Sequence, residues 1–132
     1  MVEDQNFHKV KKIIYVLILF FVFASKSYSQ NFKLEKLVKL DSPWGSSFIN
    51  SNEIIITEKS GKIKIVNILS REVQEISHQL NFVVHGQGGL LDIIHKDNNI
   101  WISYTEDRGG YKTSTSIARA EFNKKQLNFK NI

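Results

Sequence analysis

The chain has 132 residues, of which 42% are hydrophobic and 23% are charged, with one proline and no cysteine. This length suits at most one compact domain, and the composition excludes a wholly disordered or collagen-like chain. The lack of cysteine excludes a disulfide framework, a thiolate zinc site, a cysteine nucleophile and a lipidated cysteine anchor.

The first 29 residues have the pattern of a secretory signal peptide. Lysines at positions 9, 11 and 12 precede the apolar run Ile13–Ala24, and small polar residues follow it. The run is shorter than the roughly 20 residues that a membrane-spanning helix needs. Ser27 and Ser29 supply the two small residues of a cleavage site, so we expect export to the periplasm and cleavage after Ser29. An uncleaved N-terminal anchor is the alternative, because the Ala-x-Ala pattern is not strictly met.

The predicted domains are therefore a signal peptide over residues 1–29 and an exported domain over residues 30–132. The net charge is +5 for the whole chain and about +3 for residues 30–132. Lysines of the exported part alternate with apolar residues, as Lys62 and Lys64 do, instead of forming the basic patch of a nucleic-acid-binding protein. We expect no nucleic acid partner, and a membrane contact only through the export signal.

The exported part alternates short β-strand patterns with turns. Glu53–Glu58 is rich in β-branched residues, and Lys62–Val66 alternates lysine with isoleucine, which predicts two strands with the isoleucines of the second on one face. Ser60 and Gly61 between them predict a hairpin, because glycine adopts the positive φ of a tight turn. Further strands are predicted at residues 37–40, 44–49, 71–76, 90–95, 100–105 and 116–122, with turns at 98–99 and 108–110.

Short strands at intervals of about 8–12 residues predict an all-β sandwich, barrel or propeller. Strand-rich blocks begin near Leu37 and Leu90, a spacing of roughly 50 residues that is typical of propeller blades. The apolar-polar alternation over Asn128–Ile132 continues to the last residue without a closing turn. We therefore expect residues 30–132 to form about two N-terminal blades of an incomplete propeller.

One segment, Phe82–His95, contains three of the seven glycines within four positions: Gly86, Gly88 and Gly89. Glycine permits positive φ and the close approach of a ligand to the backbone, although a bulged strand entrance is the simpler interpretation. A dinucleotide-binding fingerprint is excluded, because Leu91 replaces its third glycine and no helix pattern follows. A P-loop is excluded because no Gly-Lys-Ser/Thr is present.

The titratable residues by themselves predict no catalytic or metal site. The histidines of the exported part lack the one-face spacing of a metal motif: His78, His85 and His95. A general-base role is open to Asp92, but four acidic residues are most simply interpreted as solvated or as capping a turn: Glu58, Asp92, Glu106 and Asp107. No Ser-His-Asp arrangement is evident.

Four segments occur in an order and spacing that chance explains poorly: Ser42–Gly45, Ile55–Ile63, Gly86–Asp92 and Ile100–Tyr104. Together they resemble the soluble glucose/sorbosone dehydrogenases, which are pyrroloquinoline-quinone (PQQ)-dependent aldose sugar dehydrogenases. The resemblance covers residues 37–122. It implies a six-bladed β-propeller that is exported to the periplasm, with calcium supporting the dimer or the cofactor site.

The resemblance also implies a reaction, hydride transfer from the anomeric carbon of an aldose to the quinone of PQQ, with an external electron acceptor. A histidine base removes the hydroxyl proton in that family, while arginines and a lysine hold the cofactor. Of these pocket residues only a glutamine maps onto this chain, at Gln87. Its amide both donates and accepts hydrogen bonds, so we expect Gln87 to contact the sugar and the cofactor. A homodimer is expected for the intact protein.

The chain also departs from the family pattern. The family usually has His-Pro-Asp-Phe after the Leu-Leu-Asp strand, whereas this chain has His95-Lys96-Asp97-Asn98. His95 therefore matches the turn histidine and not the catalytic base, which the family carries in a later His-x-x-Gly-Arg segment. The cofactor-binding lysine and arginines and the calcium loop are likewise outside this sequence. We expect these 132 residues alone to bind neither PQQ nor calcium fully and to lack catalytic activity.

Three hypotheses fit the exported part. The first is the N-terminal part of a periplasmic PQQ-dependent sugar dehydrogenase. The second is a non-catalytic exported propeller that serves as a binding module, with Gln87 an ordinary loop residue. The third is a self-contained small β domain, which requires cooperative unfolding of the exported chain. For the third we expect aggregation or a molten state instead, because an unclosed sheet leaves strand edges unpaired.

Overall fold

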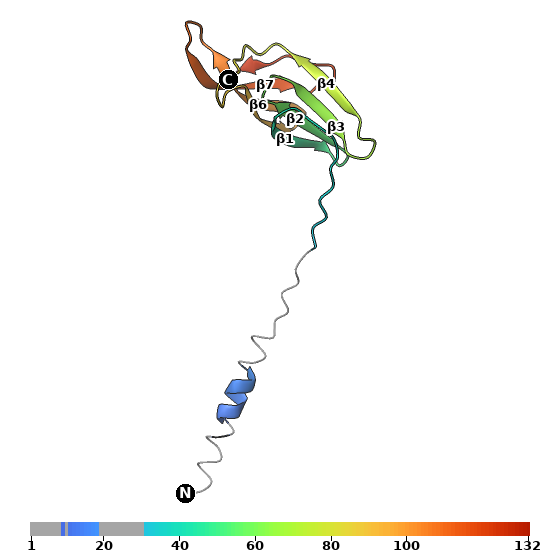
Figure 1. Ribbon diagram of the computed structural model, residues 1–132, viewed down its shortest axis with the longest axis vertical. Helices are drawn as coiled ribbons and strands as arrows, with labels where there is room; N and C mark the ends of the chain where they lie inside the picture. The colour runs from blue at the N-terminus through green and yellow to red at the C-terminus, as the bar shows by residue number, and fades with distance from the viewer. Residues whose placement is uncertain (1–8, 10, 19–30) are drawn as a thin grey trace. The chain divides into compact units, whose positions relative to one another are not determined.

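The computed structural model describes residues 9, 11–18 and 31–132, and it divides into two units, Met1–Leu34 and Glu35–Ile132. In the first unit, residues 11–18 are helical (Figure 1). Within the described residues, no helix has the length and apolar character needed to cross a membrane. Most of the predicted signal peptide, including its cleavage site after Ser29, lies outside the described residues.

The second unit consists of two β-sheets. The first sheet is an antiparallel meander of four strands with a short fifth strand parallel to the last of them: β1 (Pro43–Asn50), β2 (Glu53–Glu58), β3 (Ile63–Asn67), β4 (Val73–His78) and β8 (Gln126–Leu127). The second sheet is antiparallel throughout: β5 (Leu90–Lys96), β6 (Asn99–Asp107), β7 (Thr113–Glu121) and β9 (Lys130–Asn131). The predicted β-rich architecture is confirmed, and the two sheets begin 47 residues apart, at Pro43 and Leu90.

Two local predictions were wrong. Residues 37–40 form no strand; their leucines are half-buried, and the next residue, Asp41, donates its backbone N–H to the Glu58 carboxylate instead of to a strand neighbour. The turn after β5 is centred one residue earlier than predicted, on Asp97 and Asn98, which both have positive φ. Asn99 is already paired with Lys96, because asparagine and aspartate tolerate the left-handed backbone of such a two-residue turn.

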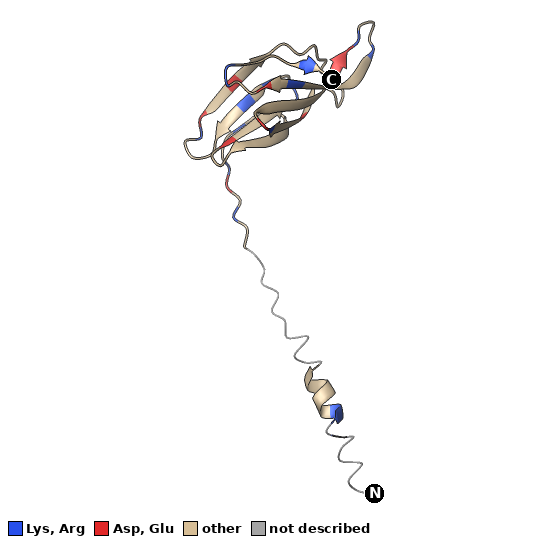
Figure 2. Cartoon of the chain, turned by 180° about the vertical axis from the view of Figure 1, so that it is seen from behind, with Lys and Arg blue, Asp and Glu red and all other residues tan. Residues whose placement is uncertain are grey.

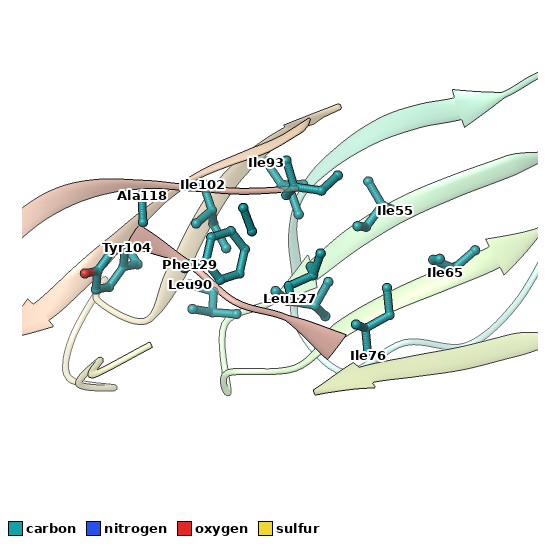
Figure 3. Close-up of a cluster of buried hydrophobic side chains, with 13 residues drawn as sticks. Ile55, Ile65, Ile76, Leu90, Ile93, Ile102, Tyr104, Ala118, Leu127 and Phe129 are labelled. Atoms are coloured by element: carbon teal, nitrogen blue, oxygen red, sulfur yellow. The ribbon is translucent and has the colours of Figure 1, made fainter. Parts of the chain in front are cut away.

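The hydrophobic core lies between the two sheets (Figure 3). The alternation in β3 has the predicted effect, since Ile63 and Ile65 are buried in this core. Their sheet contributes Ile55 and Ile76 as well, and the second sheet contributes a matching set: Leu90, Ile93, Ile100, Ile102, Tyr104, Ala118 and Ala120. Burial of this apolar surface holds each sheet against the other, because each core side chain removed from water contributes about 1.5–3 kcal/mol.

The C-terminal segment joins the two sheets at their outer strands. Its strand β8 pairs with β4 of the first sheet, and its strand β9 pairs with β7 of the second. Between and beside these short strands, Leu127 and Phe129 enter the core, while Asn128 and Lys130 are exposed. The alternation near the end of the sequence therefore caps the outer edge of both sheets over a few residues.

Charges of both signs are interspersed over the described part of the chain (Figure 2). Two carboxylates depart from the solvated state predicted for them: Glu58 is fully buried, and Glu106 is 13% exposed and accepts hydrogen bonds from Ser116 and Asn131. Lys64, on the polar face of β3, is 17% exposed, and its Nζ lies 2.8 Å from Glu58 Oε1. One lysine on the polar face of β3 thus forms a largely buried ion pair, which the alternation of lysine and isoleucine does not predict.

Candidate functional site

The predicted contact residue, Gln87, lies in a loop formed by residues 83–89, here called the Gln87 loop. Both ends of this loop are bonded to one residue of β6, Thr105. The Val83 N–H donates to the Thr105 carbonyl at 2.9 Å, and the Thr105 N–H donates to the Gly89 carbonyl at the same distance. The loop is therefore closed at its base by the backbone of the second sheet.

At the tip, a tight turn exposes Gln87. The Gly88 N–H donates to the His85 carbonyl at 2.7 Å, and Gly86 has a φ of +54°. His85, Gly86 and Gln87 are all exposed. The tip thus presents one side-chain amide, with a donor and an acceptor, beside an exposed imidazole.

The glycines on the second half of the loop are required by close packing. A Cβ on Gly88 would lie 2.9 Å from Thr105 Oγ1, and a Cβ on Gly89 would lie 2.2 Å from the Lys59 carbonyl oxygen. Gly89 also has a φ of +146°. The strand that follows it, β5, shifts register between Leu90 and Ile93, so the bulged strand entrance considered from the sequence is present. Here the bulge and the close backbone approach occur together.

The turn between β2 and β3, residues 59–61, packs against this loop. Lys59 Nζ donates a hydrogen bond to the Gly86 carbonyl. Gly61 lies under a ring, since a Cβ there would be 2.0 Å from Phe82 Cζ. His78 Nδ1 accepts from the Leu80 N–H, so its Nε2 carries the proton and donates to the Gly61 carbonyl at 2.7 Å. The predicted hairpin is confirmed, and its turn supports a loop from the other sheet.

A buried threonine connects three of the segments that carry the family resemblance. Thr57 Oγ1 accepts the Gly45 N–H at 2.9 Å and donates to the Leu91 carbonyl at 2.5 Å. A Cβ on Gly45 would lie 2.6 Å from the Asp92 Cα, so the first and third segments touch directly. Three of the four segments that carry the resemblance therefore meet at one place in the fold.

The electrostatics next to the β2–β3 turn centre on Glu58. Burial raises the pKa of this carboxyl, but hydrogen bonds from Lys64 and from the Asp41 N–H outweigh that effect and hold the pKa below its ordinary value of 4.5. The distances are 2.8 Å from Lys64 Nζ and 2.7 Å from the Asp41 nitrogen, both to Oε1. The other oxygen, Oε2, has no partner among the described residues.

The remaining residues considered from the sequence are dispersed. His78 packs against Phe82 and Phe129, and His95 packs against Phe122. Asp92 is exposed, and its Oδ1 accepts the Ile93 N–H at 2.9 Å. No group of three or more histidines, aspartates or glutamates in the described part of the chain is arranged to hold a metal ion.

Sequence reasoning missed Lys59 and Thr105 as supports of the Gln87 loop, and Thr57 as a support of β5, the strand that follows it. Their partners are 27 or more residues away in two of the three cases, so no local spacing identifies them. A hollow of about 910 Å³ lies elsewhere, among residues that include Trp101, Arg119 and Phe122, and it does not include the Gln87 loop. We base the candidate site on the loop, because its geometry presents a specific hydrogen-bonding group.

Comparison with known proteins gives concordant results for sequence and structure. Residues 40–132 match the family described as Glucose / Sorbosone dehydrogenase. The aldose sugar dehydrogenase YliI of Escherichia coli is 31% identical over 85 residues, which is 60% of this chain and 23% of that protein. The crystal structure of the soluble aldose sugar dehydrogenase from Escherichia coli superposes with a TM-score of 0.64 at 25% identity, over 70% of this chain and 29% of that chain.

The PQQ-bound aldose sugar dehydrogenase from Streptomyces coelicolor shares the fold, with a TM-score of 0.62 at 19% identity over 71% of this chain and 30% of that chain. This chain spans about a quarter of the length of the curated relative and just under a third of the solved chains. The family match covers more than half of the 132 residues and confirms the resemblance seen in the motifs. The chain belongs to the glucose/sorbosone dehydrogenase family.

Proposed function

We propose that this chain supplies the Gln87 loop of a PQQ-dependent aldose sugar dehydrogenase. The observation that carries the proposal is the exposed amide of Gln87 at the tip of a loop whose base and shoulder are both hydrogen-bonded. Family membership supports it, as does the solved relative that binds PQQ. We propose an aldose as the substrate, PQQ as the cofactor and an external molecule as the electron acceptor.

The residues at the tip fit a sugar-and-cofactor contact. A Cβ at Gly86 would meet nothing within 4 Å, so a ligand can approach the backbone beside Gln87. The Gln87 amide donates to one oxygen and accepts from one hydroxyl, which suits a sugar held next to a quinone. When bound, PQQ accepts the hydride of the anomeric C–H and so supplies the redox chemistry. Gln87 orients the sugar, and we assign no proton-transfer step to a residue of this chain.

The same proposal covers architecture and location. We assign the two sheets to two blades of a six-bladed β-propeller, supported by the relatives that are three to four times longer than the match. Export to the periplasm is proposed from the lysines and apolar run of residues 9–24. Calcium and a homodimer are proposed from the family alone. N-terminal sequencing of the exported protein tests the cleavage after Ser29.

The direct test is aldose oxidation by the intact gene product with an artificial electron acceptor. We expect turnover only when PQQ and calcium are both added. Gln87→Ala should lower kcat/KM about tenfold or more, the loss of roughly one well-placed hydrogen bond. Gln74→Ala is the matched control, since Gln74, which lies on β4, is also exposed but donates to the Lys124 carbonyl, away from the Gln87 loop. Turnover without PQQ, or none from a correctly folded protein, would contradict the proposal.

A non-catalytic exported binding module is the second candidate, favoured only by the lack of an assigned catalytic base in this chain. Sequencing of the gene through the codon for Ile132 separates the two. The dehydrogenase requires a His-x-x-Gly-Arg segment with cofactor-binding lysine and arginine residues in the same frame. A binding module requires none of them.

A further inference from the structure

We propose that Lys59 is a positioning residue for Gln87: it holds the tip of the Gln87 loop from the opposite sheet. The contact between Lys59 and the loop is seen in the structure, whereas an effect of Lys59 on catalysis rests on the proposed function of Gln87. Lys59 lies in the β2–β3 turn of the first sheet, whereas the loop is closed on β6 of the second sheet. It does not touch the reacting atoms in this proposal.

Lys59 contacts the loop on both sides of Gln87. Its Nζ donates to the carbonyl of Gly86, the residue before Gln87. Its own carbonyl oxygen lies so close to Gly89 that a Cβ there would be 2.2 Å from it. One residue therefore restrains both shoulders of the exposed tip. A hydrogen bond from a charged donor is stronger than a neutral one, so the ammonium contact has the larger effect on orientation.

The backbone of Lys59 is itself fixed. Its N–H donates to the Ser42 carbonyl at 3.0 Å, and the Gly61 N–H closes the turn on the Glu58 carbonyl at 2.9 Å. The adjacent Glu58 carboxylate is bonded through its Oε1 to Lys64 and not to Lys59. Lys59 is half-buried as a residue, and its ammonium is directed at the loop by the solvent-exposed hydrogen bond to the Gly86 carbonyl.

The base of the loop does not depend on this contact. Thr105 holds Val83 and Gly89 through its backbone whether or not the ammonium is present. Loss of the Lys59 side chain should therefore loosen the tip and leave the base and the strands intact. This separation distinguishes a positioning role from general stabilisation of the fold.

Amide hydrogen exchange on the intact gene product tests the structural half. In Lys59→Met we expect the Gly88 amide, which bonds to His85, to exchange about tenfold faster, while the Val83 amide keeps its rate. Lys59→Arg should restore protection, because a guanidinium also donates to a carbonyl. The control is Lys62→Met, because the half-exposed Lys62 side chain pairs with Glu75, at 3.4 Å from its Nζ, and not with the loop. Unchanged exchange in Lys59→Met, or equal acceleration at Val83, would overturn the assignment.

Aldose turnover with PQQ and calcium tests the functional half. Lys59→Met should lower kcat about tenfold, with partial recovery in Lys59→Arg and wild-type kinetics in Lys62→Met. Faster exchange at the tip with unchanged turnover would overturn the link between Lys59 and Gln87. If the wild-type protein shows no PQQ-dependent oxidation, the proposed function fails, and the exchange experiment alone then decides whether Lys59 braces the loop.

Discussion

Two regions of the molecule contain glycines with positive φ but differ in what surrounds those glycines. At the braced end, formed by residues 59–61 and 83–89, two glycines with positive φ are packed and a third, Gly86 at the tip, is open: a Cβ on Gly61 would lie 2.0 Å from a Phe82 ring atom, and one on Gly89 would lie 2.2 Å from a carbonyl oxygen. In the β6–β7 turn, Gly109 and Gly110 also have positive φ, but a Cβ on either would meet nothing within 4 Å. Gly61 and Gly89 are therefore required for both space and φ, whereas Gly109 and Gly110 are required for φ alone.

The charges follow the same division. Glu58 next to the braced end is fully buried and Lys64 is 17% exposed, whereas Arg108 in the β6–β7 turn is 55% exposed and its partner Glu106 is 13% exposed. Buried, closely packed groups hold a loop that presents Gln87, and the open turn merely reverses the chain. Substitutions at the braced end should therefore cost more stability than equivalent ones at the open turn.

The largest effect is expected for Lys64→Met. It leaves the Glu58 carboxylate buried without its cation, which typically costs about 3–5 kcal/mol of unfolding free energy. Arg108→Met is the counterpart at the open turn, where the loss should be about 1 kcal/mol or less, because Arg108 is exposed and Glu106 keeps its hydrogen bonds from Ser116 and Asn131. Urea unfolding of the intact gene product at pH 7, followed by tryptophan fluorescence, measures both losses. Equal losses would remove the distinction between the two regions.

The loss in Lys64→Met should depend on pH. The pKa of Glu58 is lower in the folded state than its ordinary value of 4.5, so this carboxylate contributes stability above about pH 4.5. That contribution is lost as the pH falls through the lower folded value. The difference in stability between wild type and Lys64→Met should therefore shrink as the pH at which unfolding is measured is lowered below about 4.5. A constant difference from pH 7 to pH 3 would show that Glu58 is not the group involved.

Next in size is Gly89→Ala. The new methyl meets a backbone oxygen, which cannot rotate away, and the backbone is in a region that only glycine adopts easily, so we expect a loss of about 3 kcal/mol. Gly86→Ala is the control in the same loop, because it has a positive φ but open space, and it should lose only about 1 kcal/mol. A loss in Gly89→Ala no greater than in Gly86→Ala would contradict the close packing.

A smaller loss, about 2 kcal/mol, is expected for Gly61→Ala. Here the obstacle is the Phe82 ring, a side chain that can move aside at the expense of its packing. The double variant Gly61→Ala with Phe82→Leu should show a coupling between the two sites, because the smaller side chain leaves room for the methyl group. Strictly additive losses in the urea transitions would rule out contact between them.

The smallest effect is expected for Gly109→Ala, about 1 kcal/mol, from backbone strain alone. Gly109→Asn should lose less, since asparagine tolerates a positive φ better than alanine. Thermal unfolding of the two variants measures the difference. A loss in Gly109→Ala as large as in Gly89→Ala would erase the contrast between the open turn and the braced end.

Much of the fold was predictable because its signals are local. The alternation over residues 62–66 indicated which isoleucines are buried, and Gly61 indicated the hairpin. The family motifs located the Gln87 loop, and the family match confirmed their meaning. The strand predicted over residues 37–40 was wrong because the prediction rested on local apolar residues alone, and their backbone pairs with neither sheet.

The contacts that support the loop were not predictable from spacing. The Lys59 ammonium and the Gly86 carbonyl are 27 residues apart, and Thr57 reaches Leu91 across 34 residues. The burial of Glu58 depends in turn on the backbone at Asp41 and on Lys64 across the hairpin. The Lys59 and Thr57 contacts form only when the two sheets pack together, and the Glu58 contacts form only when the first sheet is assembled, so hydropathy and turn patterns do not predict them.

The most direct test of the account is PQQ-dependent aldose oxidation by the intact gene product, compared between wild type and Gln87→Ala. The account predicts turnover that requires PQQ and calcium and falls about tenfold or more in Gln87→Ala, with Gln74→Ala unchanged. Oxidation that proceeds without PQQ, or full turnover in Gln87→Ala, would contradict it.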